Sequence, residues 1–166
     1  AKRPSWIGKE NPEWLHNYTV KFWNQGWKDV IYAKPKSYLD RLIDAGFDGG
    51  YLDKIDIIDV LSDDAPKGMN VFNEMVKFLQ GISKKANERT NNRFALVASN
   101  AESALDDDDY RAVMHAIGKE DLFFNSHFNG KELIDGFPND PEAIKEQIRL
   151  CKRLIDDNKL VLAVEY

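Results

Sequence analysis

The chain alternates between segments with the pattern of a β-strand and segments with the pattern of an α-helix, and this alternation constrains the fold most. Strand-like runs are rich in β-branched, aromatic or continuous apolar residues, and they lie at 18–23, 47–53, 94–99, 113–119 and 159–166. Runs with helical spacing of apolar residues lie between them, at 25–33, 37–46, 67–89, 101–112 and 140–158. Strands that alternate with helices predict parallel βα units.

Two of the predicted helices carry sequence signals at their ends. Ser37 and Asp40 have the spacing of a capping box, and Gly46 follows the last helical residue. Asp140 is placed to cap the helix that opens with Pro141. These signals support the predicted boundaries of both helices.

Two architectures fit parallel βα units: an open doubly wound sheet and a (β/α) barrel. The chain contains neither G-x-G-x-x-G nor G-x-x-x-x-G-K-[ST], which lowers the case for a nucleotide-binding sheet. A barrel needs eight strands and about 250 residues, whereas this chain has 166 residues. We therefore expect an α/β fold, namely a parallel (β/α)8 TIM-type barrel that is partial and lacks strands at one or both ends. A single domain is predicted over residues 1–166.

Composition excludes several classes of function. The net charge is -5 and Lys and Arg form no block, so no nucleic-acid partner is expected. No apolar run approaches the roughly 20 residues of a membrane span. Cys151 is the single cysteine and is predicted to pack in a core. His16, His115 and His127 are scattered without zinc spacing, and we predict no metal site and no cofactor.

Carboxylates follow most of the predicted strands. In parallel α/β folds, active sites gather at the carboxyl ends of the strands. The polar and aromatic residues at these ends are Trp23, Asp53, Asn100, Glu102, Glu120, Glu165 and Tyr166. A pair of carboxylates with aromatic side chains around it is typical of glycoside hydrolysis. The same oxygen atoms suit Mg²⁺ or Ca²⁺, so this alternative stays open.

The segment GFDGGYLDKID singles out one of these acids. Strand alternation places Tyr51 and Asp53 on one face. Gly49 and Gly50 leave room for another backbone to approach closely. Asp56 lies past the strand, so Asp53 is the better candidate for a pocket.

Five segments together resemble a known family. In order and rough spacing, WIGKENPEWLHNYTVKFWNQGWKDVI, GFDGGYLDKID, ALVASNAE, GKEDLFFN and LVLAVEY are similar to glycoside hydrolase family 114, the endo-α-1,4-polygalactosaminidase-like (β/α)8 barrels. The resemblance implies retaining hydrolysis of α-1,4-linked galactosamine-containing polysaccharide. It implies Asp53 as nucleophile and Glu120 as acid/base. The family's early strands and its last strand have no counterpart here, so we expect a trimmed piece of a longer protein.

The remaining site residues are predicted to bind substrate. Asn100, Glu165 and Tyr166 are implied by the resemblance, and Trp23 and Tyr51 are expected to shape the sugar site. An extracellular or periplasmic location is implied by the resemblance alone. Two rival functions stay open: a non-catalytic glycan-binding barrel, and a metal-dependent hydrolase that uses Asp53, Asp56 and Glu102.

Overall fold

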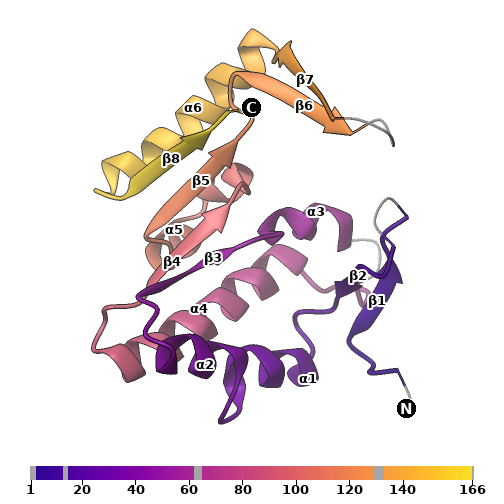
Figure 1. Ribbon diagram of the computed structural model, residues 1–166, viewed down its shortest axis with the longest axis vertical. Helices are drawn as coiled ribbons and strands as arrows, with labels where there is room; N and C mark the ends of the chain where they lie inside the picture. Colours follow the sequence, from indigo (N-terminus) through magenta and orange to yellow (C-terminus); the bar gives the residue numbers. More distant parts are fainter. Residues whose placement is uncertain (1–2, 13–14, 62–64, 129–132, 166) are drawn as a thin grey trace. The chain divides into compact units, whose positions relative to one another are not determined.

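The computed structural model describes residues 3–12, 15–61, 65–128 and 133–165 (Figure 1). The chain forms two compact units, of which the first comprises Ala1–Asp48 and Ile57–Phe94, and the second comprises Gly49–Asp56 and Ala95–Tyr166. A single domain over residues 1–166 stays a prediction. In the described part of the chain, no helix is long and apolar enough to cross a membrane.

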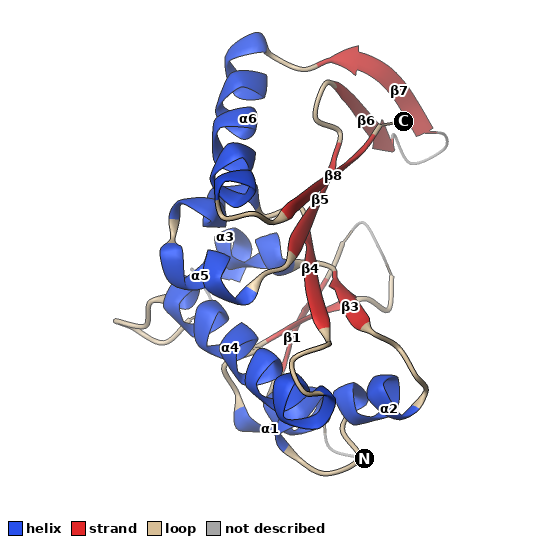
Figure 2. Cartoon of the chain, turned by 90° about the vertical axis from the view of Figure 1, so that its left-hand side faces the viewer, coloured by secondary structure: helices blue, strands red, loops and turns tan. Residues whose placement is uncertain are grey.

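The second unit is built on a parallel four-stranded sheet (Figure 2). Its strands follow the order β3 (Gly49–Leu52), β4 (Ala95–Ser99), β5 (Ala116–Glu120) and β8 (Leu160–Val164). The predicted α/β fold with parallel strands is thereby confirmed, and the sheet is consistent with part of a TIM-type barrel.

The register of the sheet brings the carboxyl ends of its strands to one edge. Leu52 pairs with Ala98, and Ser99 pairs with Gly118. Glu120 pairs with Val164, so the last two strands end level with one another. The residues that follow these strands therefore lie along the same edge of the sheet.

Helical segments of the second unit pack on one another and on β8. They are the 3-10 helix η4 (Glu102–Asp106), α5 (Asp108–Val113) and α6 (Pro141–Asp156). As predicted, Asp140 caps α6 by accepting hydrogen bonds from the backbone N–H groups of Glu142 and Ala143. Cys151 on α6 is buried, and burial raises the pKa of its thiol, in keeping with a core residue.

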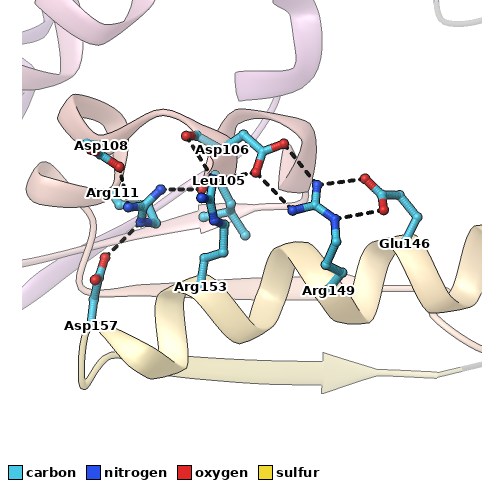
Figure 3. A network of polar contacts seen from close by, with 8 residues as sticks. All are labelled: Leu105, Asp106, Asp108, Arg111, Glu146, Arg149, Arg153 and Asp157. Atoms are coloured by element: carbon cyan, nitrogen blue, oxygen red, sulfur yellow. Dashed lines mark hydrogen bonds and ion pairs between the residues drawn. The ribbon is translucent and has the colours of Figure 1, made fainter.

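Ion pairs join α6 to η4 (Figure 3). Asp106 accepts hydrogen bonds from Arg149, at 2.9 Å, and from Arg153, at 2.5 Å. Glu146, one helical turn before Arg149, also accepts from that guanidinium. These contacts fix the segment that follows β4 against the helix that precedes β8.

An antiparallel hairpin that the sequence pattern did not predict follows the sheet strand β5. Its strands are β6 (Phe124–Phe128) and β7 (Leu133–Pro138), and Asn125 pairs with Phe137. The segment contains Gly130, Gly136 and Pro138, residue types that are depleted in regular strands and common in turns.

The first unit corrects the prediction for residues 18–23. This segment forms only β2 (Tyr18–Val20), which pairs antiparallel with β1 (Ile7–Glu10) in a two-stranded sheet. After Val20 the chain turns, since the N–H of Asn24 donates to the carbonyl of Lys21, and the Asn24 side chain caps the following helix by accepting from the N–H of Gly26. The prediction that residues 18–23 form a parallel strand of a βα unit is therefore wrong.

The helices of the first unit follow the sequence signals closely. They are α1 (Gln25–Lys28), the π-helix η1 (Asp29–Ala33), α2 (Tyr38–Asp44), α3 (Ile58–Leu61) and α4 (Val71–Thr90), and the 3-10 turn η2 (Ile55–Ile57) precedes α3. The predicted capping box of Ser37 and Asp40 is present in α2. α4 begins later than predicted because Asn70 caps it.

Candidate functional site

The carboxyl edge of the parallel sheet carries four of the predicted site residues. Asp53 directly follows β3, Asn100 follows β4, and Glu165 follows β8. Glu120 is the last residue of β5, which extends one residue further than predicted. All four belong to the second unit.

Asn100 and Glu120 form a reciprocal pair of hydrogen bonds. The Nδ2 atom of Asn100 donates to Oε2 of Glu120, at 3.1 Å. The backbone N–H of Glu120 donates to Oδ1 of Asn100, at 2.9 Å. Asn100 is itself held because its backbone N–H donates to the carbonyl of Gly118. The direction of the Glu120 carboxyl is thereby fixed by the neighbouring strand.

Tyr51 reaches across the sheet from β3 to β5. A Cβ atom built on Gly118 would lie only 2.8 Å from Cε2 and 3.0 Å from Cζ of Tyr51. The phenol ring therefore packs on the bare backbone of β5, while Tyr51 as a whole residue remains 54% exposed. Strand alternation places Glu120 on the same face as Gly118, so the ring of Tyr51 lies on the face from which the Glu120 carboxyl projects.

Asp53 is exposed and accepts a hydrogen bond from the backbone N–H of Lys54, at 2.8 Å. Lys54 has a φ of 60°, in the left-handed region that is rare for residues other than glycine. The same region holds Asn100, Ala101 and Asp121, at the ends of the next two strands. Other non-glycine residues with positive φ lie away from this edge, at His16, Lys36, Asn91, Asn92 and Asn158, so this backbone conformation marks sharp turns at the strand ends and does not by itself identify a site.

The carboxylate of Glu165 is occupied by backbone donors. It accepts hydrogen bonds from the N–H groups of Leu122, Phe123 and Phe124. These residues form the loop that leaves β5 just after Glu120. The substrate-binding role of Glu165 stays a prediction. Its observed contacts bind the backbone of the loop after β5.

Glu102 forms an ion pair with Lys119 of β5. Its Oε1 atom lies 3.3 Å from Nζ of the buried Lys119, which also donates to the carbonyl of Glu120. Among the described residues, no group of three or more His, Cys, Asp and Glu side chains lies together as a metal site requires. The three acids of the metal-dependent alternative are therefore not assembled.

Two further predicted site residues do not belong to the described part of the second unit. Trp23 belongs to the first unit, where its ring contacts that of Phe22 edge-on at 5.0 Å. Tyr166 lies outside the described residues. Their roles in substrate binding stay predictions.

The sequence analysis missed two residues that shape the site. Gly118 provides the space for Tyr51, and a glycine inside a predicted strand, two residues before Glu120, was an available signal of close approach. Asn139 binds the carbonyl groups of Asp121 and Leu122. It has no signal in the sequence because it lies 18 residues beyond Asp121.

A parallel βα sheet that presents Asp53, Glu120 and Tyr51 at its carboxyl edge has residue types that barrel glycoside hydrolases use. A family model described as glycoside-hydrolase family GH114 matches residues 1–166, so the chain belongs to this family.

Three relatives are similar to the chain. An uncharacterized protein of Methanocaldococcus jannaschii is 35% identical over 98% of this chain and 44% of its own length. An uncharacterized protein of Thermotoga maritima is 31% identical over 98% of this chain and 47% of its own length. An uncharacterized protein of Deinococcus radiodurans is 32% identical over 72% of this chain and 36% of its own length. The chain thus spans less than half the length of these relatives.

Proposed function

We propose that this chain carries the catalytic pair of a retaining glycoside hydrolase that cleaves α-1,4-linked galactosamine-containing polysaccharide. The observation that carries the proposal is the placement of Asp53 and Glu120 at one edge of the parallel sheet, with Glu120 oriented by Asn100. Membership of family GH114 supports the class of reaction. The polymer itself rests on the resemblance of the sequence motifs.

In the proposed reaction, Glu120 donates a proton to the glycosidic oxygen while Asp53 attacks the anomeric carbon. The bond to the leaving sugar breaks, and a covalent glycosyl-enzyme forms on Asp53. A water molecule then attacks the same carbon, Glu120 takes its proton, and Asp53 leaves. Tyr51 offers the exposed part of its ring to the apolar face of a sugar.

The first test replaces each acid in the full protein. Asp53→Asn and Glu120→Gln are expected to lower kcat on a galactosamine-containing polymer by at least about 10³-fold, because each removes a group that acts in the transition state. New reducing ends measure the rate. Azide should restore turnover to Asp53→Ala as a glycosyl azide, since a small anion can take the place of the nucleophile.

Asp56→Asn is the matched control, because Asp56 is an exposed aspartate three residues after Asp53. Its activity should stay within about twofold of wild type, as expected for a group that takes no part in the transition state. If Asp53→Asn and Glu120→Gln retain wild-type kcat, the assignment of the catalytic pair is wrong.

We also propose that the protein acts outside the cytoplasm, as the resemblance implies. A polymeric substrate is consistent with this location. Cell fractionation with an antibody against the chain tests it, and a purely cytoplasmic signal would contradict it.

A further inference from the structure

The loop that leaves β5 is held through its backbone by several hydrogen bonds. Glu120 ends the strand, Asp121 turns with a φ of 53°, and β6 begins at Phe124. The N–H of Asp121 donates to the carbonyl of Val164, at 3.0 Å, and extends the pairing of β5 with β8 by one residue. Any movement of this loop would therefore displace the backbone of Glu120.

One carboxylate binds the N–H groups of this loop. Oε1 of Glu165 accepts from Leu122 at 2.9 Å and from Phe123 at 3.2 Å. Its Oε2 atom accepts from Phe123 at 3.3 Å and from Phe124 at 3.2 Å. Hydrogen bonds to an ionised acceptor are stronger than those between neutral groups, so this contact holds the loop firmly to the end of β8.

The carbonyl groups of the same loop are bound by Asn139. Its Nδ2 atom donates to the carbonyl of Asp121, at 2.7 Å, and to that of Leu122, at 3.2 Å. Its backbone N–H donates to the carbonyl of Phe123, at 2.9 Å. Glu165 and Asn139 thus bind the donors and the acceptors of one short loop, which leaves its backbone little freedom.

We propose that Glu165 is a positioning residue for Glu120. It acts by holding the loop 121–124, and through it the end of β5, in the geometry that proton transfer needs. This inference rests on the proposed function of Glu120 as acid/base. Catalytic groups must be held within about 0.5 Å of their productive geometry, and the loop begins at the residue directly after Glu120.

The same geometry argues against direct contact of Glu165 with a sugar. Both of its oxygen atoms already accept from backbone donors. A sugar hydroxyl or ammonium group would have to compete with the N–H groups of Leu122, Phe123 and Phe124 for these oxygen atoms. The two roles differ in their kinetics, because a positioning role acts on kcat and a substrate contact acts mainly on KM.

The test is Glu165→Gln in the full protein. Glutamine offers one acceptor oxygen, and its NH₂ group would face backbone donors. We expect kcat on oligosaccharide to fall about 10- to 100-fold with KM changed by less than about twofold. Hydrogen exchange, read by mass spectrometry or NMR, should accelerate at the amides of Leu122, Phe123 and Phe124.

Asn139→Ala provides an independent test, because it loosens the loop and leaves the carboxylate in place. It should also lower kcat more than it raises KM. Glu142→Gln is the matched control, since Glu142 is an exposed glutamate of the same unit. It should change neither the kinetics nor the exchange of the loop amides. The thermal midpoint of each variant confirms that the fold is retained.

Two results would overturn the proposal. If Glu165→Gln raises KM and leaves both kcat and amide exchange unchanged, Glu165 contacts substrate. If the loop amides exchange faster while kcat stays at the wild-type value, the loop is held by Glu165 but does not position Glu120. A failure of the proposed function can be distinguished from a failure of this inference. If Glu120 is not the acid/base, Glu120→Gln keeps full activity, whatever the exchange rates of the loop amides.

Discussion

Gly118 shows how a single residue without a side chain shapes the candidate site. The ring of Tyr51 packs where the Cβ of any other residue would be. Its neighbour two positions along the strand is Glu120, the proposed acid/base. At this scale, the sequence analysis proposed residues for the chemistry, which stay predictions, and missed the residue that makes space for Tyr51. The reason is that a carboxylate can be identified as a candidate from its residue type. The need for a glycine at position 118 arises only because Tyr51 of another strand packs there.

We predict that Gly118→Ala displaces Tyr51 and weakens substrate binding. The added methyl group would clash with the ring at Cε2 and Cζ, and the exposed tyrosine can swing away, so the fold should survive. KM for oligosaccharide should rise about tenfold, the loss expected when one aromatic stacking contact is removed. Steady-state kinetics and isothermal titration calorimetry measure the effect.

Tyr51→Ala should weaken binding by a similar factor, and combining it with Gly118→Ala should add little, because both changes remove the same contact. Fully additive losses in the double variant would contradict the account of Gly118 as space for Tyr51.

At the scale of elements, Asp40 joins α2 to α4 within the first unit. Its carboxylate is buried, closes the capping box with Ser37, and accepts from Arg89 at 2.7 Å. Lys85 lies 3.6 Å away. Burial alone would raise the pKa of Asp40, but the hydrogen bonds from Arg89 and Ser37, together with the charge of Lys85, lower it below its ordinary value.

We predict that Asp40→Asn lowers the free energy of unfolding by about 2 kcal/mol at neutral pH, since it removes the charge of a buried carboxylate that accepts hydrogen bonds from the partly exposed Arg89 and from Ser37. A depressed pKa stabilises the fold at pH values above the ordinary 3.8, and this contribution is lost as pH falls through the folded-state value. The difference between variant and wild type should therefore shrink below about pH 4. Urea unfolding from pH 7 to pH 3 measures it.

Asp44→Asn is the matched control, because Asp44 also pairs with Arg89 but its side chain is 64% exposed. Its effect on unfolding should stay below about 1 kcal/mol. A variant of Asp40 that loses equal stability at every pH would contradict the proposed charge contribution.

At the scale of the whole molecule, the chain matches the family over residues 1–166 and spans under half of its relatives. The acids at the sheet edge are each bound by different partners: Glu102 by Lys119, Glu120 by Asn100, and Glu165 by backbone N–H groups. They do not converge on one point as metal ligands do. In the described part of the chain these three acids therefore have separate partners, and catalysis by Asp53 and Glu120 stays our proposal.

We predict that exhaustive EDTA treatment leaves the rate of polymer cleavage unchanged, because neither proposed catalytic step involves a metal ion. The assay is reducing-end release before and after treatment, with Mg²⁺ and Ca²⁺ added back separately. A loss of activity that either ion restores would favour the metal-dependent alternative.

The sequence by itself determined the elements of this protein that depend on local patterns. Apolar periodicity marked the strands of the parallel sheet, capping residues marked α2 and α6, and the Y-L-D motif pointed to Asp53. These features rest on interactions between residues close in sequence, so they can be read without knowing the fold.

Only the tertiary structure decided how distant segments share their polar groups. It paired β2 with β1 instead of the parallel sheet, and it placed Asn100 against Glu120. It also bound Glu165 to a loop 41 to 43 residues away. Such contacts depend on strand order and register, and the type of a side chain does not encode either. Any acid at a strand end presents the same oxygen atoms, and the fold decides which donor lies near them.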